Sequence, residues 1–197
     1  GTGTGVSPVV ARIARKLNAL TVAVVTRPFG FEGRIRALHA DNGIRELREC
    51  VDTLLVIPND RIFGVIEENA PADEAFRRVD DVLRQAVQSI SDIITMSGDI
   101  NVDFNDFRAI MTNVGEAHMG VGEAEGANRA LEAARRAVSS PLLENASIEG
   151  AKGLLVNIMG SKRKLSLKDI DRLAVIVQRG VAAKPGLMLG VATATLR

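Results

Sequence analysis

The sequence has no tryptophan and no tyrosine, and aromatic residues make up only 3% of its 197 residues. Proteins that bind single-stranded nucleic acid stack bases on aromatic side chains, so this shortage argues against such a protein. Neither sign of charge is in excess, because 25 basic and 24 acidic residues leave a net charge of +1. A dedicated nucleic-acid binder carries a strong basic excess. We therefore expect no nucleic-acid partner.

Cysteine and long apolar runs are also scarce. Cys50 is the only cysteine, so no internal disulfide can form, and a reducing cytoplasm is the simplest interpretation. No apolar run reaches the length of a transmembrane helix. The first residues lack the charged-then-apolar pattern of a signal peptide. We expect no direct insertion into a membrane, although apolar residues make up 46% of the chain and can form a sizeable core.

The first half of the chain alternates between helical and strand patterns. Helices are predicted at 6–18, at 32–49 and from Pro71 onward, and strands at 21–26 and 53–57. Both strands are continuous apolar runs, which is typical of strands buried on both faces of a parallel sheet. The helix from Pro71 is long, with apolar residues at steps of three and four. This alternation predicts an α/β unit with a parallel sheet.

The second half has a different pattern. Helices are predicted at 106–113 and 128–139, and strands at 153–159 and 187–193. Ser166 and Asp169 resemble a capping box that opens a further helix through Val177. We interpret this half as a smaller α+β domain. The polar loop near 95–100 would separate the two domains, 1–95 and 96–197.

The sequence opens with GTGTG, at Gly1–Gly5, without a starting methionine and without a strand in front of the glycines. Glycine-rich loops usually follow a strand. The first half offers only two or three buried strands, whereas a typical sheet has about five or six. These observations favour a fragment of a longer protein. A small complete domain with trimmed expression residues is the alternative.

Polar residues follow each predicted strand, at the edge where parallel sheets bind ligands. Glu32 and Arg36 come after the first strand and could meet a ribose and a phosphate. Asn59 comes directly after the second strand. GTGTG followed by a helix would direct backbone N–H groups toward an anion, although it lacks the Gly-Lys-Ser/Thr of a P-loop.

Phe76 and Asp80 lie four residues apart on the long helix and therefore share a face. A ring that stacks on a base and a carboxylate that accepts two guanine N–H donors would form a purine site. Taken singly, each of these residues is more simply explained as part of the core or the solvated surface. Together with the three features above, they favour one nucleotide site.

These motifs occur in the order seen in one known family. GTGTG, TVAVVTRPFGFEGRIR, VDTLLVIPND, EAFRRVDDVL, NVDFNDFRAIM and GAKGLLVNI resemble the FtsZ family, the bacterial cell-division homologues of tubulin. The resemblance covers nearly the whole chain and weakens after Ile158. GTGTG looks like the end of the family signature GGGTGTG. The resemblance implies a partial Rossmann-like GTPase domain with a parallel sheet, a long central helix, and a smaller domain without its last strands.

The resemblance also implies roles for single residues. Phosphates would be cradled by Gly1, Thr2, Gly3, Thr4 and Gly5. Glu32 and Arg36 would contact ribose and phosphate, Asn59 the ribose or base, Phe76 the face of guanine and Asp80 its edge. Asn101, Asp103 and Asp106 resemble the family's synergy loop and would polarise water against the GTP of the next subunit. A simpler interpretation of the two aspartates is that they stabilise a helix N-terminus.

The implied parent protein is a cytoplasmic GTPase at the division septum. It would bind GTP or GDP with Mg²⁺, polymerise head to tail with itself and meet other division proteins. Two alternatives stay open: an inactive structural or interaction fragment, and an unrelated nucleotide-dependent oxidoreductase. The second is disfavoured because no acidic residue ends a second strand about 20 residues after the glycines. With only part of the phosphate cradle present, the chain alone should bind GTP weakly or not at all.

Overall fold

The computed structural model describes residues 2–62, 71–96, 102–112, 114–143, 153–160, 166–180 and 186–192. The chain forms two compact units. Residues 1–87 and 111–119 make the first unit, and 88–110 and 120–197 make the second. The predicted domain boundary between residues 95 and 96 stays a prediction. In the structure, residues 111–119 pack with the first unit.

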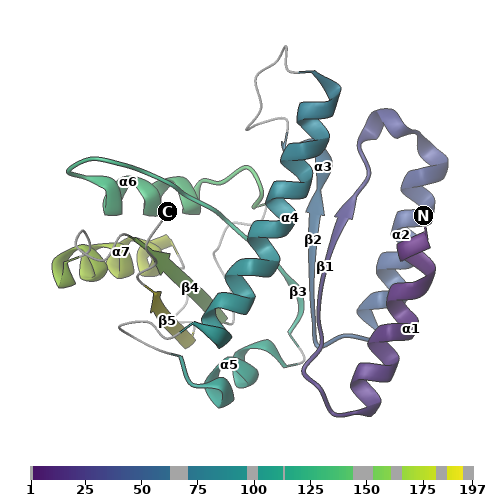
Figure 1. Ribbon diagram of the computed structural model, residues 1–197, viewed down its shortest axis with the longest axis horizontal. Helices are drawn as coiled ribbons and strands as arrows, with labels where there is room; N and C mark the ends of the chain where they lie inside the picture. The colour runs from purple at the N-terminus through teal and green to yellow at the C-terminus, as the bar shows by residue number, and fades with distance from the viewer. Residues whose placement is uncertain are drawn as a thin grey trace. The chain divides into compact units, whose positions relative to one another are not determined.

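The first unit is built around a parallel sheet (Figure 1). In chain order its elements are α1 (Thr2–Lys16), β1 (Val22–Arg27), the 3-10 helix η1 (Gly30–Glu32), α2 (Arg34–Arg48), β2 (Thr53–Pro58), α3 (Asn59–Ile62), the first part of α4 (Ala72–Thr95) and β3 (Gly115–Ala117). The strand order is β1-β2-β3, and Val22 lies opposite Thr53 while Arg27 lies opposite Pro58. The predicted parallel sheet is confirmed, and the loops after β1 and β2 leave the same edge of it.

The strand β3 was not predicted from the sequence. It pairs in parallel with β2, with Gly115 opposite Thr53. The N–H groups of Val114 and Gly115 donate to the carbonyl oxygen of Asp52 at 3.0 and 3.2 Å, which fixes where the strand begins. Three residues are too few for a periodic pattern, and a parallel strand of this kind is recognised only by its partner.

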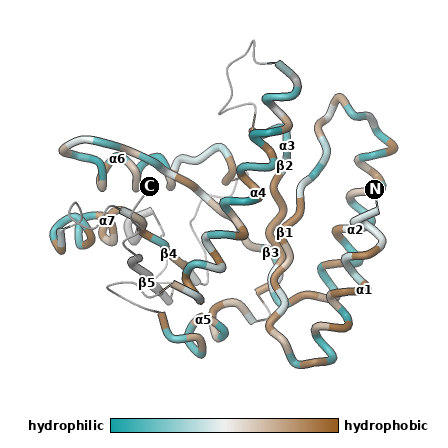
Figure 2. Tube along the Cα trace, in the orientation of Figure 1, coloured by the Kyte–Doolittle hydropathy of each residue, from teal (hydrophilic) through white to brown (hydrophobic). Residues whose placement is uncertain are grey.

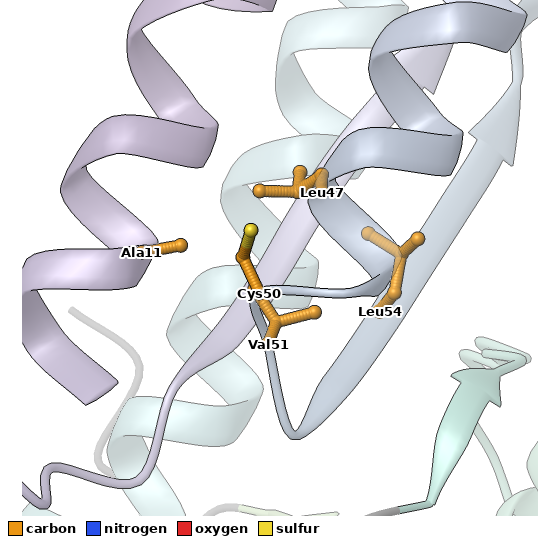
Figure 3. Packing of buried hydrophobic residues seen from close by; sticks show 5 residues of the cluster. All are labelled: Ala11, Leu47, Cys50, Val51 and Leu54. Atoms are coloured by element: carbon orange, nitrogen blue, oxygen red, sulfur yellow. The ribbon is translucent and has the colours of Figure 1, made fainter. Parts of the chain in front are cut away.

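The core of the first unit joins α1, α2 and the sheet. Ala11, Leu47, Cys50, Val51 and Leu54 form a buried cluster (Figure 3). Burying each large aliphatic side chain contributes about 1.5–3 kcal/mol. The brown course of β1 and β2 in Figure 2 shows the apolar runs that supply the sheet side of this core. The cluster holds α2 against the strands and therefore holds the loops at their ends.

One face of α1 stays outside this core. Four apolar side chains on it are between 49% and 58% exposed: Val6, Val9, Val10 and Ile13. Leu17, directly after the helix, is 76% exposed. The buried side of the helix is instead made of the small residues Pro8 and Ala11. An apolar stripe of this spacing is what a helix normally turns toward a core.

The second unit contains the end of α4, most of α5 (Phe104–Met111), α6 (Arg129–Val138), β4 (Gly153–Met159), α7 (Leu167–Gly180) and β5 (Gly186–Ala192). The strands β4 and β5 pair in parallel, with Gly153 opposite Gly186. Ala134, Ile158 and Leu173 form its buried cluster. The predicted capping box is confirmed, because Ser166 Oγ accepts from the N–H of Asp169 at 3.2 Å and Asp169 Oδ2 accepts from the N–H of Ser166 at 3.1 Å.

Candidate nucleotide site and candidate catalytic acids

The glycine-rich start of the chain is the first turn of a helix rather than a loop before it. The sequence predicted a helix from residue 6, whereas α1 begins at Thr2. The N-terminus of a helix carries the positive end of the helix dipole, which favours an anion there. A Cβ at Gly3 or Gly5 would meet nothing within 4 Å, so open space adjoins this turn. Gly1 lies outside the described residues.

Gly43 of α2 holds the beginning of α1 in place. A Cβ on Gly43 would lie 2.3 Å from Thr4 Cγ2, far inside a normal contact. Only glycine lets α2 approach the first turn of α1 so closely. Gly43 was not predicted as a site residue, because nothing in a single sequence distinguishes it from other helical glycines.

The loop after β1 brings Glu32 and Arg36 together. Glu32 Oε1 accepts from the N–H of Phe29 at 2.9 Å, and Glu32 Oε2 accepts from Arg36 Nη1 at 2.6 Å. The Glu32 side chain is 15% exposed and that of Arg36 is 71% exposed. Such an ion pair contributes only about 0–1 kcal/mol. Arg36 can therefore turn toward a phosphate, while Glu32 keeps its bond to the loop.

Three phenylalanines gather at this edge of the sheet. The ring of Phe29 is 1% exposed and stacks on Phe31, with centroids 4.9 Å apart and planes at 15°. Its edge meets the ring of Phe76 in α4, with centroids 5.6 Å apart and planes at 84°. Phe76 itself is 47% exposed. The structure thus brings Phe76 to the loop after β1, and sequence reasoning missed Phe29 as its partner.

The end of β2 carries Asn59 and Asp60, in the short helix α3. Asn59 is 6% exposed, and its Oδ1 is one of two buried side-chain oxygens without a hydrogen-bond partner in the described part of the chain. The neighbouring Asp60 Oδ1 accepts from the N–H of Gly30 at 3.0 Å. Asp60 follows the same strand as Asn59, so its place in the sequence marks it equally as a candidate.

The face of α4 that carries the predicted base-binding residues points away from the core. Val79, Val82 and Ala86 are buried, whereas Phe76 and Asp80 are exposed. Both predicted residues therefore present their side chains to solvent. Phe76 is placed at the sheet edge by its contact with Phe29, and Asp80 follows one turn later on α4.

The predicted catalytic acids lie at the start of α5. Asp103 Oδ1 accepts from the N–H of Asn105 at 3.0 Å, and the Asp103 carbonyl oxygen accepts from the N–H of Phe107 at 2.9 Å. Phe107 is 1% exposed and anchors the helix, while Asp103 and Asp106 are exposed. The predicted Asn101 lies outside the described residues. Both aspartates thus lie at the N-terminus of α5, as the simpler interpretation expects, and both carboxylates are at the surface.

The acids belong to the second unit, and the predicted nucleotide residues belong to the first. Within the described ranges, no group of three or more His, Cys, Asp or Glu side chains gathers as a metal site. We therefore assign no residue to the predicted Mg²⁺ and derive no step through it. None of the helices in those ranges is long and apolar enough to cross a membrane.

Two protein-family models match the chain. The model of the Tubulin/FtsZ family, GTPase domain, matches residues 1–67, and that of the FtsZ family, C-terminal domain, matches residues 115–195.

Solved structures match over almost the whole chain. An empty FtsZ dimer from M. jannaschii is 41% identical, with a TM-score of 0.94, and the match covers 100% of this chain and 57% of that one. An FtsZ mutant from M. jannaschii is 42% identical, with a TM-score of 0.93 over 98% of this chain and 57% of that one. A GDP-bound monomer of CetZ1 from Haloferax volcanii has a TM-score of 0.77 at 23% identity, over 99% of this chain and 57% of that one, and shows the fold alone. The chain thus spans little more than half the length of these proteins.

Proposed function

This chain belongs to the tubulin/FtsZ family, and on that premise we propose that it carries part of the GTP site of a GTPase that polymerises head to tail. The first unit would bind guanine nucleotide at the edge where β1 and β2 end. The second unit would present acids to the nucleotide of the next subunit. In the cell, we propose a cytoplasmic protein that acts at the division septum with other division proteins and binds GTP together with Mg²⁺.

The observation that carries the nucleotide proposal is the unsatisfied oxygen of Asn59. Its Oδ1 is buried at the carboxyl end of β2 and has no hydrogen-bond partner among the residues that the structure describes. Leaving a buried acceptor unpaired costs about 1–3 kcal/mol, so such a group calls for an explanation. A ligand that donates a hydrogen bond there, from a ribose hydroxyl or a base N–H, supplies one. The place agrees with the edge where parallel sheets bind ligands.

Base recognition would come from α4. The half-exposed ring of Phe76 offers a face for a purine, and base–aromatic stacking contributes about 1–3 kcal/mol. The exposed carboxylate of Asp80, one turn along the same face, accepts hydrogen bonds only. Guanine presents two adjacent donors, N1–H and the N2 amine, whereas adenine presents an acceptor at N1. A carboxylate at this position therefore selects guanine.

Phosphate and ribose would meet the two loops beside α4. The first turn of α1, from Thr2 to Gly5, carries the positive end of the helix dipole, which favours an anion. Gly1 would extend this cradle. Arg36 is exposed enough to turn from Glu32 to a phosphate. Glu32 would then accept from the ribose hydroxyls through the oxygen that Arg36 releases.

Hydrolysis would need a second subunit. Asp103 and Asp106 lie exposed at the beginning of α5, in the unit that does not hold the nucleotide residues. With Asn101 they would orient and polarise the water that attacks the γ-phosphate of the neighbour's GTP. Positioning of water is the main contribution that side chains make to phosphoryl transfer. The M. jannaschii relative was solved as a dimer, which supports self-association.

The nucleotide proposal is tested on a completed protein, in which residues 1–197 are joined to the parts of M. jannaschii FtsZ that they do not cover. Calorimetry should show GTP binding, and Asp80→Ala should reduce the preference for GTP over ATP. Asp81→Ala is the matched control, because Asp81 pairs with Arg84 at 3.5 Å on the same helix. Unchanged selectivity in Asp80→Ala would show that this carboxylate does not recognise the base.

A further inference from the structure

A hydrogen bond joins the segments that follow β1 and β2 at the edge of the sheet. Asp60 Oδ1 accepts from the N–H of Gly30 at 3.0 Å, across 30 positions of sequence. The residues meet because β1 and β2 are parallel and end together, with Arg27 opposite Pro58. This bond therefore ties the segment after β1 to the segment after β2.

The segment held at Gly30 carries one residue of the proposed site, Glu32, and adjoins the ring of Phe29 that supports another. Gly30 begins η1, and Glu32 ends it. Glu32 is held in turn by the N–H of Phe29 at 2.9 Å. The buried ring of Phe29 meets Phe76 edge-on. A shift of the Gly30 amide would therefore displace both the ribose-binding carboxylate and the support of the base-stacking ring.

The charge of Asp60 makes its presence here notable. The side chain lies one residue after Asn59, at the edge where the proposed function places an anionic nucleotide. A carboxylate beside phosphates weakens their binding by like-charge repulsion. Its benefit must then lie elsewhere, and the hydrogen bond to Gly30 offers one: an ionised acceptor makes a stronger hydrogen bond to a backbone N–H than a neutral one.

We propose that Asp60 is a positioning residue for nucleotide binding, acting through the Gly30 amide on Glu32 and Phe29. This inference rests on the proposed function. It differs from a simpler role, in which Asp60 is only an acid in the first turn of α3 that interacts with the helix. In the simpler role, the effect of replacing Asp60 does not depend on whether Gly30 still donates its hydrogen bond. In the proposed role, replacing either residue removes the same hydrogen bond, so the two effects do not add.

Four variants of the completed protein separate these roles. Asp60→Ala removes the acceptor, and Asp60→Asn keeps an acceptor without the charge. Gly30→Pro removes the donor, and the backbone suits it, because Phe29 has φ −60° and ψ 147°, the region that a residue before proline requires. Gly30→Ala keeps the donor, and its Cβ would meet Asp60 Oδ2 at an ordinary 3.5 Å.

The readouts are GTP affinity by calorimetry and the hydrolysis rate at saturating GTP. Asp60→Ala and Gly30→Pro should each weaken GTP binding by roughly 2- to 10-fold, the usual range for one hydrogen bond, with the saturated rate unchanged. The two combined should lose no more than either alone, because both remove the same bond. Gly30→Ala should stay within about 2-fold of the parent, since donor and acceptor both remain. Asp60→Asn should lose less than Asp60→Ala, because its neutral oxygen still accepts the hydrogen bond but more weakly than a carboxylate does.

Several results would overturn the inference. Unchanged affinity in Asp60→Ala, or losses that add in the double variant, would mean that the bond to Gly30 does not position the site. A loss in Asp60→Asn as large as in Asp60→Ala would mean that the charge matters and the acceptor does not. If Asp60→Ala does not fold, the comparison of GTP affinity between Gly30→Pro and Gly30→Ala tests the inference, and equal affinities of these two variants would overturn it. If the parent completed protein binds no GTP, the proposed function fails and this inference fails with it.

Discussion

The ring of Phe29 stands edge-on to the ring of Phe76, with centroids 5.6 Å apart and planes at 84°. One ring comes from the loop after β1 and the other from α4, so the contact joins two elements that the sequence separates by more than 40 positions. Phe29 is 1% exposed and Phe76 is 47% exposed. The buried ring therefore acts as a support for the exposed one.

Phe29→Ala should lower the free energy of unfolding of the 197-residue chain by about 3–5 kcal/mol, because it opens a cavity where a large ring is buried. Phe31→Ala is the matched control. Phe31 is 70% exposed. Its replacement removes only the stacking on Phe29 and should lower the free energy of unfolding by about 0.5–1.5 kcal/mol. Urea denaturation measures both. Equal effects of the two substitutions would contradict the supporting role of Phe29.

Gly120 and Gly122 should be intolerant of any side chain. A Cβ on Gly120 would lie 2.1 Å from the carbonyl oxygen of Ala137, and one on Gly122 would lie 2.0 Å from that of Ala133. Both obstacles are backbone atoms of α6, so no rotamer change relieves them. We expect Gly120→Ala and Gly122→Ala each to cost about 1–3 kcal/mol, as overpacking does.

Gly153→Ala is the control for these two glycines. Its Cβ would meet Ile110 Cγ2 at 3.2 Å, and a side chain can give way. Thermal unfolding of the three variants should show a much smaller loss for Gly153→Ala. A loss as large as those of Gly120→Ala and Gly122→Ala would mean that close packing on α6 is not the cause.

The capping box at the start of α7 should make the second unit sensitive to acid. Hydrogen bonds from Ser166, first from its backbone N–H and then from its hydroxyl, lower the pKa of Asp169 below its ordinary value of 3.8, with Arg129 adding to the effect. A carboxylate whose pKa is lowered by folding stabilises the folded state. This stabilisation is fully present at pH values above 3.8 and is lost as the pH falls through the pKa that the carboxylate has in the folded protein.

Asp169→Asn should therefore be less stable than the parent at pH 7, and the difference should shrink as the pH falls below the ordinary aspartate range. Asp171→Asn, two residues along α7 and outside the capping box, is the control. Urea denaturation at a series of pH values gives both curves. A stability difference for Asp169→Asn that does not change with pH would contradict the role of its ionised form.

The exposed stripe on α1 predicts that the 197-residue chain binds an apolar dye. Contiguous apolar surface of this kind marks a face that other protein normally covers. Val10 and Ile13 are 58% and 55% exposed, so replacing both with lysine should reduce dye fluorescence and leave the unfolding midpoint nearly unchanged. Arg12→Gln, on another face of α1, should change neither. A dye signal unaffected by the double replacement would place the apolar surface elsewhere.

Much of the fold could be predicted from the sequence, because its signals are local. The strand at 153–159 was placed at its observed bounds, and the capping box of Ser166 and Asp169 was recognised from two residues. The strand β3 was missed because three residues carry no period and its position depends on β2. The start of α1 was set too late, because glycine and threonine are poor helix formers and hide the first turn.

The candidate site was predictable only as far as it follows strand ends. Their place after strands predicted Glu32, Arg36 and Asn59 as site residues, and helical spacing predicted Phe76 and Asp80. The sequence could not show that Glu32 accepts a hydrogen bond from the N–H of Phe29, nor that Gly43 packs against Thr4. Such contacts depend on distances between elements that only packing sets.

The central claim is that one subunit binds GTP and the next supplies the acids that hydrolyse it. The most direct test mixes the completed protein with its Asp106→Ala variant and follows phosphate release as the variant's share rises. Asp106→Ala should bind GTP normally but should not promote hydrolysis of the GTP bound to the neighbouring subunit, because water-positioning groups act mainly in the transition state. Turnover per parent subunit should therefore fall steeply as the variant enters the polymers. A loss only in proportion to the parent subunits removed would contradict the shared site.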